Sequence, residues 1–326
     1  MYDSPDISVV IPVFNERENL RPLFEGIREV LDDMGRTWEL LFVDDGSTDG
    51  SYAVQQDLAL LDGHVRVVRL RRNFGQTAAM SAGFDHAQGE IIITMDGDLQ
   101  NDPTDIPMLV ETLETGYDIV SGWRKGRKDP LISKRFPSFI SNKVASWVTG
   151  VKLHDYGCTL KAYRKEILDE IHLYGELHRF IPALAGAIGA RVGEVEVKHH
   201  ARTNGKSKYG VGRLLRGFLD ILSLKLLISY STRPMQIFGG LGMLSILMGI
   251  FSAGATVTMK LAIGTNMTGN PLLYLTILAV LVGIQFITMG FLGEINIRTY
   301  HESVKKPIYV IRDVIGEKSE KLALMR

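Results

Sequence analysis

The sequence predicts an α/β protein in which helices flank a mostly parallel sheet, followed by a hairpin of two transmembrane helices. In the first 230 residues, short apolar runs alternate with segments of helical periodicity. Runs that are apolar throughout are typical of strands buried on both faces of a parallel sheet. Further along, two long blocks contain no charged residue. These observations indicate one α/β domain and one membrane-embedded segment.

Strands and helices alternate regularly through the first hundred residues. Ser47 or Thr48 is the expected N-cap of the second helix, because a side-chain oxygen there accepts a backbone N–H bond. Ligands of such sheets bind beyond the carboxyl ends of the strands, and the polar motifs lie there. The expected strands are 7–15, 38–46, 65–70 and 90–96, the expected helices end near 34, 61 and 86, and the motifs are 12–16, 44–47 and 96–98.

Two uncharged blocks predict the membrane hairpin. Residues 234–259 contain no charge, and none follows Lys260 until Glu294. Each block supplies the roughly 20 residues that a helix needs to cross a bilayer. The segment 264–271 between them, GTNMTGNP, is typical of a tight connection. We therefore expect transmembrane helices at about 234–259 and 271–293; the alternative is a helical hairpin buried in a soluble core.

The basic residues that flank the two spans predict their orientation. Four precede the first span and four follow the second, whereas the connection has only Lys260 at its edge. By the positive-inside rule, both termini are expected in the cytoplasm. The stretch 212–233 alternates basic and apolar residues, which predicts an amphipathic helix in the membrane interface or one packed on the α/β domain. The single cysteine, Cys158, excludes internal disulfides and fits a reducing compartment.

Two classes of ligand are disfavoured by the sequence. Lys and Arg number 37, and so do Asp and Glu, so the net charge gives no sign of an acidic partner and we expect no nucleic acid. A dinucleotide site requires a G-x-G-x-x-G turn after the first strand. The turn here reads PVFNERENL and contains no glycine. A nicotinamide-dependent oxidoreductase is therefore excluded.

The segment DGD at 96–98 indicates a divalent cation. Two carboxylates at positions i and i+2 repel one another unless a cation lies between them. Mg²⁺ and Mn²⁺ prefer oxygen ligands and bridge to substrate phosphates. The alternative is a solvated turn. We expect no metal at His154, which has no second histidine at ligand spacing, or at His199 and His200, which strand alternation directs to opposite faces.

Four motifs in order carry a family resemblance: SVVIPVFNERENL, FVDDGSTDGS, NFGQTAAMSAGFDHAQGEIIITMDGDLQNDP and DYGCTLKAYRKEIL. They resemble the family 2 glycosyltransferases with the GT-A fold. The two C-terminal spans narrow the resemblance to polyprenyl-phosphate glycosyltransferases, which include bacterial undecaprenyl-phosphate glucosyltransferases and dolichol-phosphate mannose synthases. The similarity covers roughly residues 5–320.

The resemblance implies roles for individual residues. Asp98 and Asp155 are the implied catalytic residues; for Asp155 a base role and a positioning role both stay open, and a helix N-cap is the structural alternative. Lys134 could replace Arg135 as a phosphate ligand. The implied nucleotide-sugar contacts are Pro12, Phe14, Glu16, Val43, Asp44, Asp45, Asp96, Arg202, Lys206 and Lys208; the metal ligands are Asp96, Asp98 and Gln100; the lipid-phosphate contacts are Arg124, Arg135 and Ser138.

The implied function is inverting, metal-dependent transfer of a sugar to the phosphate of undecaprenyl phosphate at the cytoplasmic face of a bacterial plasma membrane. The expected donor is UDP-glucose, with GDP-mannose or another sugar nucleotide as the alternative, and the expected cofactor is Mg²⁺ or Mn²⁺. A phosphate monoester is mostly a dianion at neutral pH and needs no strong base. A processive polysaccharide synthase would need more spans and a Q-x-x-R-W segment. The alternative of another class is a non-catalytic, membrane-anchored scaffold that binds sugar nucleotides.

Small residues in GGLGMLSILMG at 239–249 offer a packing face for a homo-oligomer.

The chain is predicted to comprise four segments. The segments are a cytoplasmic GT-A catalytic domain at 1–210, an amphipathic interface helix at 211–232, two transmembrane helices within 233–296, and a cytoplasmic C-terminal tail at 297–326.

Overall fold

The computed structural model contains two compact units. One comprises residues 1–224 together with 307–326, and the other comprises residues 225–306. Each unit is described by itself. The structure describes residues 4–125, 142, 146, 149–171, 173, 177–200, 234–264, 266, 269–303 and 307–316.

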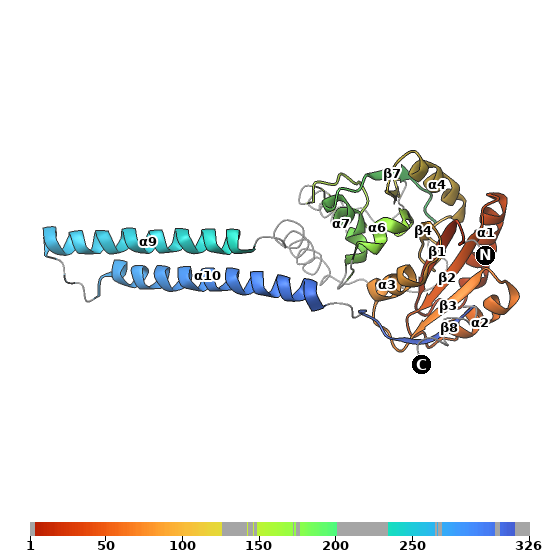
Figure 1. Ribbon diagram of the computed structural model, residues 1–326, viewed down its shortest axis with the longest axis horizontal. Helices are drawn as coiled ribbons and strands as arrows, with labels where there is room; N and C mark the ends of the chain where they lie inside the picture. The colour runs from red at the N-terminus through yellow and green to blue at the C-terminus, as the bar shows by residue number, and fades with distance from the viewer. Residues whose placement is uncertain are drawn as a thin grey trace. The chain divides into compact units, whose positions relative to one another are not determined.

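An eight-stranded sheet forms the centre of the first unit, with strand order β7-β5-β6-β4-β1-β2-β3-β8 (Figure 1). Strands β6 and β8 run antiparallel to their neighbours, and the other pairings are parallel, which confirms the predicted mostly parallel sheet. The strands are β1 Ile7–Val13, β2 Trp38–Asp44, β3 Val65–Leu70, β4 Ile91–Thr94, β5 Ile119–Trp123, β6 Lys161–Arg164, β7 Val192–Glu196 and β8 Ile311–Ile315.

Helices cover both faces of the sheet. Alternate residues of β1 point to opposite faces. Ile7, Val9 and Ile11 belong to one core cluster with apolar side chains of α1, α2 and α4. The helical segments of this unit are α1 Leu20–Asp33, α2 Ser51–Leu61, α3 Gln76–His86, η1 Pro103–Asp105, α4 Ile106–Glu114, α6 Lys165–Asp169, η3 Leu177–Phe180 and α7 Ile181–Ala187.

Helix α3 packs closely on the opposite face of β1 and β2 because it carries a glycine at the contact. A methyl group added at Gly83 would lie 2.2 Å from Val10 Cγ1 and 3.3 Å from Val43 Cγ2. Only a residue without a side chain therefore allows α3 to lie at this depth. The close packing fixes the position of the N-terminal end of α3, which contributes to the site described below.

The start of α2 differs from the prediction. The helix begins at Ser51 with Gly50 as N-cap in the left-handed region (φ 91°), so the expected capping by Ser47 or Thr48 is wrong. Instead, the Ser47 hydroxyl accepts a hydrogen bond from the Asn15 backbone N–H at 3.0 Å, and the Thr48 N–H donates to Asn15 Oδ1 at 2.8 Å. These side chains join the loop after β2 to the loop after β1.

The chain returns to the sheet after the membrane segment. Residues 311–315 form β8, which pairs antiparallel with the edge of β3. Tyr309 also donates a hydrogen bond to Asp85 at 2.8 Å, which fastens the returning chain to the end of α3. From the sequence we predict a cytoplasmic tail at 297–326 and no strand there. Part of that segment belongs to the α/β unit.

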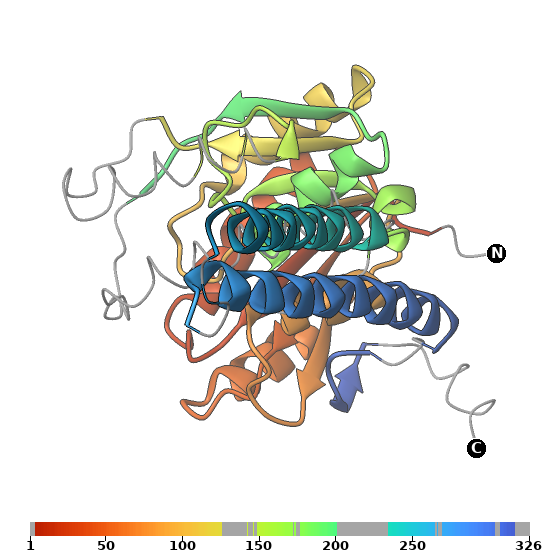
Figure 2. The ribbon, with the colours of Figure 1, turned by 90° about the vertical axis from the view of Figure 1, so that its left-hand side faces the viewer.

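The second unit is a pair of antiparallel helices, α9 Pro234–Ile263 and α10 Pro271–Ser303, which lie side by side in Figures 1 and 2. Both are long and apolar enough to cross a membrane, over Phe238–Ala262 and Pro271–Gly293. Large apolar side chains on their outer surfaces are exposed, for example Phe251 at 83%. Such exposure disfavours a hairpin buried in a soluble core.

Small residues form the contact between the two long helices. A methyl group at Gly242 would lie 2.7 Å from the Gly283 carbonyl oxygen, and one at Gly283 would lie 2.8 Å from that of Gly242. The Ser245 hydroxyl donates to the Ala279 carbonyl at 2.8 Å, which satisfies a polar group inside the apolar pair. The small-residue face at 239–249 is thus used at least partly within the hairpin. The homo-oligomer stays a prediction.

Candidate functional site

The candidate site lies at one edge of the sheet, where the loops after β1, β2, β4 and β5 meet. These strands run in the same direction, so their carboxyl ends share an edge. Strand β6 runs the opposite way between β4 and β5, which brings the loop that precedes it, residues 154–160, to the same edge. The topology therefore unites segments that are up to 140 residues apart in sequence.

Asp96 lies just beyond the end of β4 and is held by two side chains. The Gln76 amide at the start of α3 donates to Asp96 Oδ1 at 2.9 Å, and the Thr159 hydroxyl donates to Oδ2 at 2.6 Å. Asp98 is 8% exposed, and its Oδ1 accepts the Gln100 backbone N–H at 3.2 Å. The donors to Asp96 are thus neutral, and Asp98 accepts a backbone N–H of its own loop.

The backbone between the two candidate ligands Asp98 and Gln100 is strained. Leu99 has a φ of 61°, in the left-handed region that side chains with a Cβ rarely adopt. Such a conformation costs about 1 kcal/mol or more and is typical of functional loops. The strain turns the chain back after Asp98, and the Gln100 carbonyl then accepts the His200 N–H at 2.9 Å.

These residues fit a divalent cation of the magnesium type. A carboxylate oxygen has two lone pairs, so Asp96 can accept its hydrogen bonds and still bind a cation. Asp98 and the Gln100 amide add further hard oxygen donors, which suits Mg²⁺ or Mn²⁺ that completes its shell with substrate and water. Among the described residues no cluster of three or more His, Cys, Asp or Glu side chains could hold a metal by itself.

The third acid of this segment, Asp102, has a different role. Its side chain accepts the Thr104 N–H at the start of η1 and pairs with His200 Nε2 at 2.9 Å. Burial opposes ionisation, but the hydrogen bonds from Thr104 and His200 lower the pKa of Asp102 to about 2. Asp102 is therefore a structural carboxylate.

The loops after β1 and β2 form a connected wall of the site. The Glu16 N–H donates to the Ser51 hydroxyl at 2.9 Å. The Asp45 carboxylate accepts the Phe74 N–H at 2.7 Å and the Gly75 N–H at 2.9 Å. Asp45 thereby fixes the segment that leads directly into Gln76, which donates to Asp96.

The residues predicted to contact the nucleotide sugar differ in exposure. Pro12, Phe14 and Glu16 are partly exposed. A methyl group at Gly97 would lie 3.7 Å from the Pro12 carbonyl oxygen and 4.0 Å from Glu16 Cγ, so the first loop adjoins the DGD segment. These side chains remain accessible to a ligand at the sheet edge.

By contrast, the side chains of Val43 and Asp44 are fully buried. Val43 packs below Gly83, and Asp44 lies 3.7 Å from Arg69 Nε. Burial raises the pKa of both Asp44 and Asp45. In this conformation Asp44 supports the loop from inside the sheet.

Arg124 and Asp155, which the resemblance placed at the lipid phosphate and at the reaction centre, form a bidentate ion pair. Arg124 Nε lies 2.7 Å from Asp155 Oδ2, and Nη2 lies 3.1 Å from Oδ1. Their side chains are 9% and 7% exposed. Burial would lower the pKa of Arg124, but the hydrogen bonds and charge of Asp155 outweigh it and raise that pKa. No helix begins at Asp155, so the N-cap alternative is wrong.

A buried lysine holds the other end of the same loop. Lys161 is 2% exposed, and its ammonium donates to the backbone carbonyls of Cys158 and Tyr156. Burial lowers the pKa of Lys161 and raises that of the Cys158 thiol. The cationic side chain ties the turn between Asp155 and Thr159 to the sheet.

Sequence reasoning did not assign roles to Gln76, Thr159, Lys161 or Glu194. All four are individually common residue types, and only the pairing of the strands shows what they contact. Gln76, Thr159 and Lys161 lie inside the segments that resemble the family, and this position was the only sign of a role. The candidates Lys134, Arg135, Ser138, Arg202, Lys206 and Lys208, and the predicted interface helix at 211–232, lie outside the described residues.

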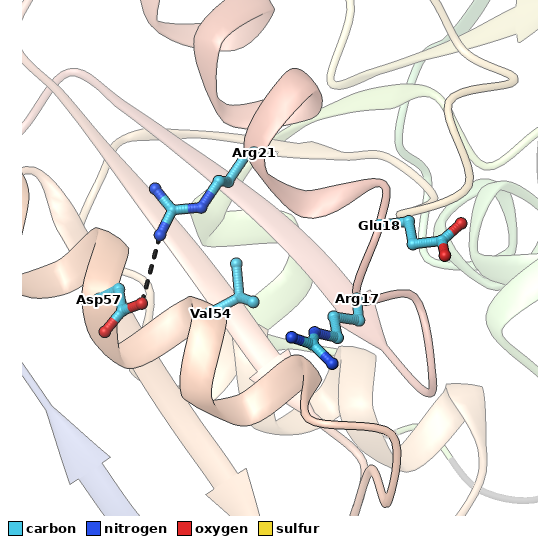
Figure 3. A pocket seen from close by; sticks show the side chains of 5 residues that line it. All are labelled: Arg17, Glu18, Arg21, Val54 and Asp57. Carbon is cyan, nitrogen blue, oxygen red and sulfur yellow. Dashed lines mark hydrogen bonds and ion pairs between the residues drawn. The ribbon is translucent and has the colours of Figure 1, made fainter.

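A separate hollow lies between the start of α1 and α2 (Figure 3). It is lined by Arg17, Glu18, Arg21, Val54 and Asp57. The Arg21 and Asp57 side chains form an ion pair at 3.2 Å, and both are more than half exposed. This open, charge-paired depression contains none of the predicted site residues.

Comparison with known proteins agrees with this arrangement. A family model described as "Glycosyl transferase family 2" matches residues 8–172, which carry the loops after β1, β2, β4 and β5 and the loop before β6. The chain belongs to this family. It is a glycosyltransferase of the polyprenyl-phosphate group, because curated relatives of that group match almost its whole length.

Two such relatives and one solved structure illustrate the similarity. Dodecaprenyl-phosphate galacturonate synthase of Rhizobium johnstonii is 43% identical, over 97% of this chain and 95% of that protein. Undecaprenyl-phosphate 4-deoxy-4-formamido-L-arabinose transferase of Shewanella sediminis is 37% identical over 95% and 93%. Glucosyl-3-phosphoglycerate synthase of Mycobacterium tuberculosis, solved with Mn²⁺ and UDP-glucose, has a TM-score of 0.54 at 19% identity, over 68% and 79% of the chains. That structure shows the GT-A fold.

We predict that the buried Arg124–Asp155 pair contributes strongly to stability. Arg124→Met removes the bidentate guanidinium from the buried Asp155 carboxylate, which costs about 3–5 kcal/mol and lowers the melting temperature by roughly 10 °C. The matched control is Lys125→Met. It breaks an ion pair with Glu196 in which both side chains are 57% exposed, and such pairs contribute only about 0–1 kcal/mol. Equal melting temperatures of the two variants in detergent would contradict the prediction.

Proposed function

We propose that this protein transfers a sugar from a sugar nucleotide to the phosphate of a polyprenyl phosphate at a bacterial inner membrane. One observation carries the proposal. A relative named for such a product matches the α/β unit and the hairpin together, at 43% identity over 97% of the chain. The lipid acceptor accounts for the hairpin, and the carboxylates and the Arg124–Asp155 pair supply the chemistry.

For the sugar, galacturonate replaces glucose as our first choice. The expectation of glucose came from a general resemblance, whereas the relatives reported above are named for galacturonate and for 4-deoxy-4-formamido-L-arabinose. The galacturonate relative shares 43% of residues and the arabinose relative 37%, so we rank the uronate first and the formamido sugar second. We propose a UDP-activated donor for both.

The proposed reaction is a single in-line displacement that inverts the anomeric carbon. The lipid phosphate oxygen forms a bond to that carbon as the bond to the nucleoside diphosphate breaks. Asp96, Asp98 and Gln100 would hold a divalent cation, which when bound neutralises the charge of the donor diphosphate and of the leaving group. Pro12, Phe14 and Glu16 form the side of the edge where the nucleoside would lie.

Arginine and lysine side chains would bring the second anion, the acceptor phosphate, close to the donor diphosphate. Arg124, with Arg135 and Ser138, would hold the acceptor phosphate, and Arg202, Lys206 and Lys208 would contact the donor diphosphate. Guanidinium groups bind phosphate well. The acceptor is already a dianion near neutral pH, so a strong base is unnecessary. Because Asp155 accepts hydrogen bonds from Arg124 and Gly157, we assign it the positioning of Arg124 and not proton abstraction.

The function is tested with purified protein, undecaprenyl phosphate and a panel of labelled sugar nucleotides. We expect lipid-linked product from UDP-galacturonate with a kcat/KM at least about tenfold above that for UDP-glucose. A site that bonds the carboxylate of the uronate has unpaired polar groups when glucose, which lacks this carboxylate, is bound. The panel also contains UDP-4-deoxy-4-formamido-L-arabinose and GDP-mannose. Product from UDP-glucose alone would restore glucose as the sugar. Binding of a sugar nucleotide without turnover of any would favour the non-catalytic scaffold.

Metal dependence gives a second test. Asp98→Ala should lower the rate by at least about 100-fold, because it removes an oxygen ligand at the point where charge develops. EDTA should abolish transfer by the parent protein, and added Mn²⁺ or Mg²⁺ should restore it. Asp102→Asn is the matched control: it lies four residues away, and asparagine preserves the cap of η1. Full activity in chelator would remove the metal assignment.

We propose, from the flanking basic residues, that the α/β unit is cytoplasmic and that the connection between α9 and α10 faces the opposite side. Single cysteines at Asn266, in that connection, and at Gly63, where an added methyl group meets nothing within 4 Å, report on the two sides. In a Cys158→Ser background, a membrane-impermeant thiol reagent should label only position 266 on spheroplasts. Labelling of position 63 alone would reverse the orientation.

A further inference from the structure

Glu194 on β7 accepts several hydrogen bonds from the loop that carries Asp155. Its carboxylate accepts the His154 backbone N–H at 2.9 Å and the Asp155 N–H at 3.1 Å, and its Oε2 lies 2.7 Å from His154 Nδ1. The Glu194 side chain is 12% exposed. A nearly buried carboxylate is thus used to fix two consecutive residues of a loop.

The residues next to the Arg124–Asp155 pair are also in contact. The rings of Trp123 and His154 stack with centroids 4.3 Å apart and an interplanar angle of 18°. Residues 123–124 and 154–155 therefore meet twice, through an aromatic stack and through a bidentate ion pair. Glu194 holds the His154 ring in this stack as well as the backbone of the loop.

The pairing of β7 with β5 fixes the position of Glu194 next to residues 123–124 and 154–155. Strand β7 pairs in parallel with β5, with Glu194 opposite Ser121 and Glu196 opposite Trp123. Arg124 follows β5 directly, so its position is set by that pairing. The loop at 154–155 has no strand partner at this point, and Glu194 supplies the missing attachment to β7.

We propose that Glu194 is a positioning residue that orients Asp155, and through it Arg124, for the acceptor phosphate. The inference rests on the proposed function. The carboxylate acts through the loop backbone and the His154 ring, with which it makes the contacts given above. Without the bonds from Glu194, the Asp155 carboxylate can rotate away from the Arg124 guanidinium. The guanidinium is then no longer held in one orientation.

The test compares Glu194→Ala with Glu196→Ala. Both residues lie on the same face of β7, two positions apart, and Glu196 makes an exposed ion pair with Lys125. Glu194→Ala should lower kcat by about ten- to hundredfold, since a misplacement near 1 Å can have this effect. The KM for the sugar nucleotide should change less than about threefold, because the nucleotide loops lie elsewhere on the edge. Glu196→Ala should retain the wild-type rate.

Two further variants separate positioning from general stability. Glu194→Gln keeps an amide oxygen for the two backbone N–H groups and should recover part of kcat. In an Arg124→Lys background, Glu194→Ala should cost much less than in the wild type, because the residue acts through that pair. Additive losses of kcat in the double variant would overturn the proposal. The same holds if Glu194→Ala lowers kcat and nucleotide affinity equally and also lowers the melting temperature. A Glu194→Ala variant as active as the wild type would overturn it as well. If the wild type transfers no sugar to any polyprenyl phosphate, the proposed function fails instead.

Discussion

The antiparallel direction of β6 is the constraint on which the site depends. In a sheet of parallel strands alone, every strand would end at the edge that carries the candidate site, here called the active edge. Every strand would begin at the opposite edge. With β6 reversed between β4 and β5, the residues before this strand arrive at the active edge. Asp155 thereby reaches Arg124 after β5, and Thr159 reaches Asp96 after β4. One loop, residues 154–160, serves both halves of the proposed reaction.

The carboxylates at this edge have two kinds of hydrogen-bond partner, neutral and cationic. Asp96 and Asp45 accept hydrogen bonds from neutral amides and hydroxyls, which fix the carboxylates without neutralising them. Asp155 and Asp102 are instead bonded to cationic or ionisable partners. A carboxylate that keeps its charge can attract a cation, whereas one already paired mainly provides structure. This difference separates Asp96 from Asp102, which is close to it in sequence.

The sequence was sufficient for the parts of the protein that depend on local patterns. The parallel strands follow from apolar runs with polar ends, and the hairpin follows from two uncharged blocks. The start of α2 could not be predicted, because Ser47 and Thr48 interact with Asn15 and not with their own helix. Similarly, Arg124 carries no local sign that its partner is Asp155, 31 residues away. Strand β8 was missed for the same reason, since its pairing with β3 spans more than 240 residues.

The return of the chain in β8 changes how the membrane segment relates to the fold. Because β8 covers the edge of β3, the hairpin is inserted within the α/β unit and is not appended to it. The strand also contacts residues on the side of the edge where we propose that the nucleoside lies. Arg69 lies 3.8 Å from Asp313 of β8 and 3.7 Å from the buried Asp44, and its guanidinium stacks 3.9 Å above the Tyr52 ring. The C-terminal strand therefore helps to fix the arginine that offsets the charge of Asp44, and residues on both sides of the hairpin complete the same sheet edge.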